Sequence, residues 1–177
     1  MPRRHHHRQQ RPQARTVDVV DTQFGVPVAD PYRWLENDVR NDPQVEAWVT
    51  AENQVTDRLL QTLPLRDWFK QRMTALYDYE RYGLPVKKGD TYFYSHNSGL
   101  QNQSTLFARS GLDGVPRQLI DPNTWSKDGA TALAEWTPSE DGKLLAYSIQ
   151  DGGTDWRTVK VMDVASGKIH ADELKWL

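Results

Sequence analysis

The sequence has no cysteine among its 177 residues, which excludes disulfide bonds and thiolate catalysis. It also has almost no net charge. Its 22 basic and 24 acidic residues leave −2, so no strong field would attract nucleic acid or an anionic membrane. No apolar run approaches the length of a membrane span. We therefore expect no nucleic-acid partner, no membrane partner and a cytoplasmic location.

Hydrophobic residues make up only 37% of the chain, which is little for a self-sufficient core. The aromatic fraction is 10%, with seven Trp and seven Tyr, and this is not the composition of a disordered chain. The sequence is therefore expected to fold and to bury aromatic surface.

Residues 1–16 are basic and polar and are predicted to form a flexible tail. The pair Arg3-Arg4 is the start of a twin-arginine export signal only if an apolar segment follows, and none occurs before Asp18. We therefore do not expect export by this segment, and the periplasm is kept as the alternative location. The run His5–His7 is a weak candidate for metal binding, and a flexible tail is the favoured interpretation.

The motifs of common catalytic sites are also missing. None of the eight serines stands two residues after a glycine, so the strained Gly-x-Ser-x-Gly elbow of a hydrolase nucleophile is absent, and so are the glycine-rich phosphate loops. His96 has Ser95 and Ser98 nearby, but sequence neighbours on a strand point to opposite faces, so no triad is expected. We interpret His96 as structural or solvated and His170 as an exposed strand residue, and we predict no catalytic residue in this chain.

Three carboxylates, Asp151, Asp155 and Asp163, fall near one predicted strand pair. A calcium loop needs Asp or Asn at alternate positions and a closing glutamate, which the segment 151–155 lacks. Turn and strand-edge roles are expected for them, and the run Gln101–Gln103 is expected to satisfy loop backbone groups. We predict no cofactor-binding and no metal-binding residue.

Residues 17–78 are predicted to be a helical arm. At its start, Val17–Asp21 indicates a short strand or an extended lead-in, and Phe24–Val28, punctuated by Gly and Pro, indicates a loop. Asp30 is predicted to cap a single helical turn, with Pro31 at its first position. That turn carries two aromatic residues and a leucine, more apolar area than a surface turn needs, so we expect it to dock on other parts of the protein.

Two amphipathic helices follow in the predicted arm. Asp42 repeats the capping signal before an apolar stripe that runs to about Gln61, and a further helix is predicted at Leu65–Leu76, after Pro64. These helices and the preceding turn carry more aromatic area than about sixty residues can cover. We favour an arm that lies on a larger body, with a small independent helical domain as the alternative.

Residues 79–177 are predicted to contain two β repeats. When the chain is shifted by 53 residues against itself, seven identities align, three of them turn glycines: Pro85 with Pro138, Gly89 with Gly142, Tyr94 with Tyr147, Ser95 with Ser148, Gly99 with Gly152, Thr105 with Thr158 and Gly114 with Gly167. A period near 50 residues with several short strands is typical of β-propeller blades.

Each repeat is predicted to hold three clear strands, and the second repeat also shows a plausible fourth. The first repeat has strands at Thr91–His96, Thr105–Arg109 and Arg117–Asp121, and the second has them at Leu144–Gln150, at Trp156–Val164 and from Lys168 onward, with the fourth at Ala132–Trp136. Two blades leave an open sheet edge and uncovered faces, so the isolated chain is expected to be poorly soluble or partly molten.

Several motifs, in this order, resemble the N-terminal part of the prolyl oligopeptidase family. They are DPYRWLE at 30–36, Arg72-Met73 with LYDY at 76–79, Tyr92-Phe93-Tyr94 with GLQNQ at 99–103, Asp121-Pro122-Asn123, SEDG at 139–142 and Asp155-Trp156. The resemblance implies a mixed α and β fold. The arm would belong to an α/β-hydrolase domain, and residues 79–177 would be the first two blades of a seven-bladed propeller. That arrangement explains the apolar faces of the arm.

The resemblance further implies a serine-type endopeptidase that hydrolyses short peptides after proline, with the propeller restricting access to the active site. The family's Ser, Asp, His and oxyanion-hole groups lie in a later hydrolase portion, so none falls on this chain, and we expect the chain alone to be inactive. The implied partners are short proline-containing peptides and the missing hydrolase domain, and the complete protein is expected to be a monomer. The alternatives are a non-catalytic propeller-type interaction module and a related propeller-bearing hydrolase with another specificity.

Overall fold

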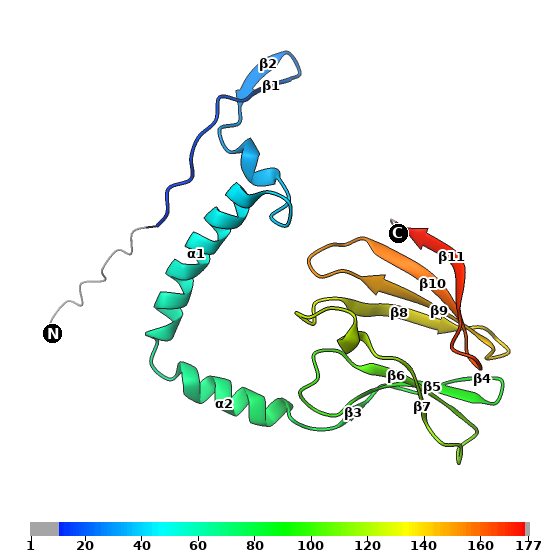
Figure 1. Ribbon diagram of the computed structural model, residues 1–177. Helices are drawn as coiled ribbons and strands as arrows, with labels where there is room; N and C mark the ends of the chain where they lie inside the picture. The colour runs from blue at the N-terminus through cyan, green and yellow to red at the C-terminus, as the bar shows by residue number, and fades with distance from the viewer. Residues whose placement is uncertain (1–10, 176–177) are drawn as a thin grey trace. The chain divides into compact units, whose positions relative to one another are not determined.

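The computed structural model describes residues 11–175 and divides into two compact units, one that ends at Lys70 and one that begins at Gln71 (Figure 1). The arginine pair and the histidine run of the N-terminal tail lie outside the described residues. Of the helices in the described part of the chain, none has both the length and the hydropathy that a membrane crossing requires.

The first unit begins with an antiparallel hairpin of β1 (Val20–Gln23) and β2 (Val26–Ala29). Phe24 and Gly25 form its two-residue turn, and both have positive φ, 52° and 81°, which matches the right-handed twist of the flanking strands. The loop predicted at Phe24–Val28 is therefore correct for Phe24 and Gly25 and wrong from Val26 onward, where β2 begins. Pro27 was taken as a strand breaker, but a two-stranded ribbon consists only of edge strands, which tolerate proline.

The aromatic turn that follows is the 3₁₀ helix η1 (Arg33–Glu36). The capping role predicted for Asp30 is wrong, because Tyr32 occupies the cap position and makes no side-chain capping bond. The carboxylate of Asp30 instead accepts a hydrogen bond from Arg33 Nε at 2.5 Å. Trp34 is buried at 8% exposure, and its indole N–H donates to the carbonyl of Arg15 at 2.9 Å.

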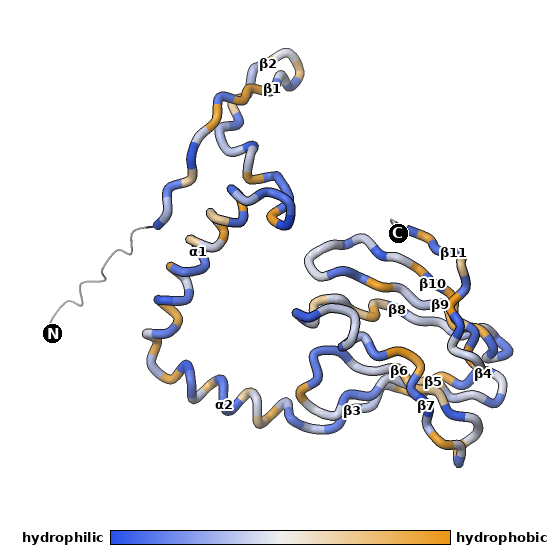
Figure 2. Tube along the Cα trace, in the orientation of Figure 1, coloured by the Kyte–Doolittle hydropathy of each residue, from blue (hydrophilic) through white to orange (hydrophobic). Residues whose placement is uncertain are grey.

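The first long helix, α1 (Pro43–Gln61), begins as predicted. Asp42 Oδ1 accepts from the backbone N–H of Gln44 at 2.8 Å and of Val45 at 3.4 Å, which confirms its capping role. Helix α2 (Arg66–Tyr77) begins one residue after the predicted start, and none of its residues is buried. Figure 2 shows apolar residues spaced among polar ones along both helices. The larger apolar side chains of α2 are each more than half exposed: Trp68, Phe69, Met73 and Leu76.

The second unit contains two antiparallel sheets. Blade 1 consists of β3 (Arg81–Tyr82), β4 (Val86–Lys88), β5 (Thr91–Asn97), β6 (Thr105–Ser110) and β7 (Arg117–Ile120), in the order β3-β5-β6-β7 with β4 also paired to β5. Blade 2 consists of β8 (Ala132–Pro138), β9 (Leu144–Gln150), β10 (Arg157–Asp163) and β11 (Ile169–Lys175), in the order β11-β10-β9-β8. A short 3₁₀ helix, η2 (Pro122–Thr124), lies between them in sequence.

The predicted repeat corresponds to these sheets. Strands β5 and β9 have seven residues each and begin and end 53 residues apart, at 91 and 97 and at 144 and 150. The plausible fourth strand of the second repeat is confirmed as β8. Its counterpart in blade 1 is split into β3 and β4, which pair with different parts of β5. The mixed α and β class with two propeller blades is confirmed.

The core of the second unit lies between the two sheets (Figure 1). Alternate residues of β5 and its neighbours face blade 2, and Phe93 and Leu106 are fully buried there. Leu145 of blade 2 is fully buried from the other side, and Tyr147 is 4% exposed. Each such side chain contributes roughly 1.5–3 kcal/mol of burial free energy. The packing of one blade on the next therefore holds this unit together.

Candidate functional site

The two blades meet closely at the turns β4–β5 and β8–β9, which the sequence repeat aligns. A Cβ atom on Gly89 would lie 2.8 Å from the carbonyl oxygen of Asp141, and one on Gly142 would lie 2.5 Å from that of Lys88. Lys88 Nζ also forms an ion pair with Glu140 at 2.5 Å. The repeated turn glycines are therefore required by contact between the blades, and this end of the interface is structural.

His96 lies on the face of blade 1 that is turned away from blade 2. Its Nε2 is 2.8 Å from Glu80 Oε1, and the hydroxyl of Tyr82 donates to the same oxygen at 2.7 Å. These hydrogen bonds, first that of Tyr82 and then that of His96, lower the pKa of Glu80, and the carboxylate raises the pKa of Tyr82. The histidine is thus engaged by a carboxylate and a ring, since the Tyr82 and His96 ring centroids are 4.6 Å apart.

The two serines close to His96 in the sequence have other surroundings. Ser95 lies against Gly83, where an added Cβ would be 2.3 Å from its hydroxyl oxygen, and Ser98 is exposed in the loop after β5. The side-chain hydrogen bond that His96 makes in the described residues is to Glu80 rather than to either of these serines. The partner Glu80 was not identified from the sequence; it directly precedes β3, in which Tyr82 pairs with His96.

The polar loop between β5 and β6 is tied to backbone groups. Asn97 Nδ2 donates to the carbonyl of Gln101 at 3.0 Å, and Gln101 Oε1 accepts from the N–H of Ser98 at 2.9 Å. Gln103 exchanges two hydrogen bonds with Asn123, one from its backbone N–H at 2.9 Å and one to its carbonyl at 3.0 Å. The role predicted for the glutamines in satisfying loop backbone is confirmed.

Two of the three acidic residues singled out in the second repeat, Asp151 and Asp163, have structural partners. Asp163 accepts from the N–H and the hydroxyl of Ser166 at 2.8 and 2.6 Å, and these bonds lower its pKa. Asp151 accepts from the hydroxyl of Thr131 at 3.3 Å. His170 is exposed on β11, as predicted. Within residues 11–175, no group of three or more His, Asp or Glu is arranged to hold a metal ion.

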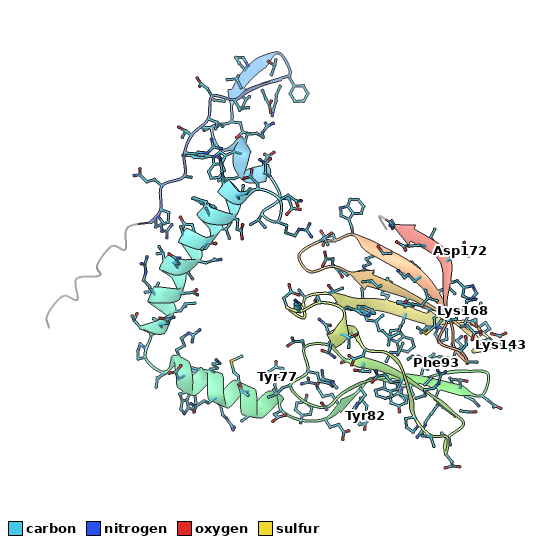
Figure 3. All side chains as sticks on the ribbon, in the orientation of Figure 1. Tyr77, Tyr82, Phe93, Lys143, Lys168 and Asp172 are labelled. Carbon is cyan, nitrogen blue, oxygen red and sulfur yellow. The ribbon has the colours of Figure 1, made fainter. Side chains whose placement is uncertain are left out.

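Among the hollows of the described residues, one lies on the free face of each blade. The free face of blade 1, the side turned away from blade 2, contains a hollow of about 480 Å³ lined by Tyr82, Tyr92, Tyr94 and Arg109 together with Gly83, Pro85, Leu112 and Pro116. Phe93 and Tyr82 lie on opposite sides of this sheet (Figure 3). The free face of blade 2 contains a groove of about 370 Å³ lined by Glu135, Ser148, Gln150, Asp155, Arg157 and Val159. The first is lined mainly by aromatic and apolar residues, and the second mainly by polar and charged ones.

Comparison with known proteins agrees with this arrangement. A sequence model described as "Prolyl oligopeptidase, N-terminal beta-propeller domain" matches residues 12–177. The chain belongs to the prolyl oligopeptidase family. A prolyl endopeptidase of Elizabethkingia meningoseptica is 40% identical over 157 residues, which are 89% of this chain and 22% of that protein. A dual function macrocyclase-peptidase of Galerina marginata is 29% identical and covers 93% of this chain and 26% of its own length.

Solved structures give the same result for this member of the prolyl oligopeptidase family. One, from a structural and mechanistic study of two prolyl endopeptidases, superposes with a TM-score of 0.77 at 35% identity and covers 94% of this chain and 24% of its own. A prolyl oligopeptidase B of Galerina marginata bound to a 35-residue substrate gives 0.70 at 28% identity. The chain spans about a quarter or less of these relatives, so it corresponds to their N-terminal portion.

Proposed function

We propose that this chain is the N-terminal part of a serine-type endopeptidase that hydrolyses short peptides after proline, and that its blades help to restrict access to the active site. The observation that carries the proposal is the match over residues 12–177 to the family's N-terminal propeller domain, together with two blades that follow the same 53-residue repeat. Relatives with the same N-terminal portion carry the name prolyl endopeptidase.

The chain alone is proposed to be inactive. In the described residues, His96 contacts Glu80 and Tyr82, and none of the serines of the sequence stands in a nucleophile elbow. Acyl transfer needs a nucleophile, a base and an oxyanion donor within reach of one reacting atom. These groups would come from the hydrolase portion, which the resemblance places later in the protein.

The exposed aromatic residues of the helical arm support this proposal. Helix α2 presents Trp68 and Phe69 at 57% and 55% exposure, and they contact each other edge to face at 5.0 Å between ring centroids. The indole N–H of Trp48 is buried and has no hydrogen-bond partner among residues 11–175. We propose that the missing hydrolase domain covers the exposed aromatic residues of α2 in a complete, monomeric and cytoplasmic enzyme.

The same exposed aromatic residues favour a second candidate, a non-catalytic module that uses them to bind a different partner protein. Fragment complementation distinguishes the two. The chain is mixed with the Elizabethkingia meningoseptica enzyme from which the matching N-terminal portion has been removed, and cleavage of a chromogenic Gly-Pro anilide is followed.

We expect no turnover from either piece and measurable turnover from the mixture. The N-terminal portion of the relative itself serves as the positive control. A Leu106→Asp variant, which places a charge in the core of blade 1, is the matched negative control. Turnover by this chain alone would refute its inactivity. A silent mixture beside an active positive control would favour the binding module.

A further inference from the structure

The chain passes from the helical arm into blade 1 through a short bend, and Arg81 contacts both sides of it. The C-terminal part of α2 belongs to the second unit, which begins at Gln71. Arg81 Nη1 donates to the carbonyl of Tyr77, the last residue of α2, at 3.1 Å. Its Nη2 donates to the carbonyl of Gly99, in the loop between β5 and β6, at 2.8 Å. One side chain therefore joins the end of the arm to a loop of the propeller.

The guanidinium of Arg81 also contacts the bend itself. It lies over the ring of Tyr79, with 5.1 Å from Cζ to the ring centroid, a distance at which a cation and an aromatic ring attract each other. The carbonyl of Tyr77 lies at the C-terminal end of a helix, where a positive charge is favourable. The helix end, the bend and the loop are thus held by one charged group.

The loop that receives Arg81 has a fixed shape. Asn97 is 4% exposed, its amide donates to the carbonyl of Gln101 at 3.0 Å, and its Oδ1 accepts from the N–H of Gly99 at 2.9 Å. Gly99 has φ +143°, and a Cβ there would overlap the carboxylate of Asp78. The loop therefore lies directly against the residue that follows α2, and the carbonyl that it offers to Arg81 is held in place.

Arg81 is not on the free face of blade 1. Tyr82, the next residue of β3, contacts the rings of Tyr94 and His96 on that face. Successive side chains of a strand point to opposite faces, so Arg81 points away from it. The partners of its guanidinium all lie within residues 77–99, and a neighbouring blade is not needed to complete these contacts.

We propose that Arg81 is the positioning residue of the joint between the arm and the propeller. This role rests on the proposed function, in which the arm belongs to the hydrolase domain. Arg81 then fixes the direction in which that domain continues from blade 1, and so helps to determine which peptides reach the active site. Rotation of the chain at Tyr79 would break both hydrogen bonds of Arg81. Each bond is charge-assisted and therefore stronger than one between neutral groups.

Hydrogen exchange of the chain alone tests the joint without reference to catalysis. Arg81→Ala should accelerate amide exchange about ten-fold in two separate segments, residues 74–79 and 98–101, because each loses a charge-assisted hydrogen bond. The hydrogen-bonded amides of Asp78 and Gly99 report on the two segments. Arg81→Lys should have a smaller effect, because an ammonium group lacks the fixed fork of donors that bridges two carbonyls.

Arg109→Ala is the matched control. It removes an arginine of the same sheet near the opposite end of β5, where Arg109 pairs with Tyr92, and it should leave both segments unchanged. Acceleration in only one segment or in neither would overturn the proposal. So would an effect that spreads evenly over both blades in a folded variant, since that is general destabilisation. Should circular dichroism show that Arg81→Ala does not fold, Arg81→Lys is judged by the same two segments.

Fragment complementation tests the consequence for access. The chain is added at saturation to the truncated Elizabethkingia meningoseptica enzyme, and the Gly-Pro anilide is compared with a proline-containing peptide of roughly thirty residues. Arg81→Ala should leave kcat for the anilide within about two-fold and raise kcat/KM for the long peptide, relative to the anilide, at least about five-fold. An unchanged ratio would overturn the role in access. A silent wild-type mixture would count against the proposed function, and the exchange result would still decide whether Arg81 holds the joint.

Discussion

Replacing Gly142 with alanine tests whether contact between the blades stabilises the second unit. Gly142 has φ +71°, and a Cβ there would lie 2.5 Å from the backbone carbonyl oxygen of Lys88. The left-handed conformation alone costs an L-residue roughly 1–2 kcal/mol. The carbonyl belongs to the neighbouring blade and can move only if the interface opens, so a further cost of about 1–3 kcal/mol is expected, as for other overpacked sites.

Gly167 provides a matched control for this prediction. Its φ is +73°, and an added Cβ would meet nothing within 4 Å. Gly167→Ala therefore carries the conformational cost without the clash. Urea unfolding followed by tryptophan fluorescence should show a clearly larger loss of unfolding free energy for Gly142→Ala. Equal losses in the two variants would refute the reasoning, because only the backbone conformation would then matter.

Three further predictions concern separate elements. Leu106→Ala, at a fully buried position, should lower the unfolding free energy by about 2–5 kcal/mol, whereas Leu112→Ala, at 64% exposure, should change it by less than about 0.5 kcal/mol in the same urea assay. Asp42→Ala should lower the helical signal in far-ultraviolet circular dichroism more than Asp57→Ala on α1, because only Asp42 caps the helix. Glu80→Gln should destabilise the chain near neutral pH. Since the pKa of Glu80 is lowered in the fold, the stabilisation by its carboxylate is present above the ordinary pKa of 4.5 and is lost as pH falls through the lowered pKa. The urea midpoints of the wild-type chain and of Glu80→Gln should therefore converge in acid.

Much of the second unit could be predicted from sequence because its signals are local and repeated. Strands β5 and β9 lie 53 residues apart, the same offset that relates the turn glycines. Buried and more exposed residues alternate along each of these strands, which is a local signal. The hairpin β1–β2 was missed because Phe24 is an uncommon residue at positive φ, so the turn gave no Asn-Gly or Asp-Gly signal. The prediction that Asp30 caps a helical turn was wrong because its carboxylate bonds to Arg33 instead. Capping propensities do not include such a side-chain contact.

The surroundings of His96 could not be predicted from spacing alone. Its contact with Glu80 accompanies the pairing of β3 with the end of β5, whereas β4 pairs with the beginning of that strand. Sequence reasoning could exclude a serine neighbour from strand geometry, but it could not supply the partner that is present.

The polar groups that invite a catalytic interpretation are, in the described residues, engaged in holding loops and strands. Glu80 links His96 to Tyr82, Asp163 closes a turn with Ser166, and Gln103 joins its loop to the linker between the blades. Apolar surface shows the reverse pattern, since Trp68 and Phe69 of α2 and Tyr82 of blade 1 are each more than half exposed. A chain that leaves apolar side chains of this kind exposed is expected to contact another domain or protein there. Its contribution to function is therefore expected to lie in those faces rather than in a reacting group.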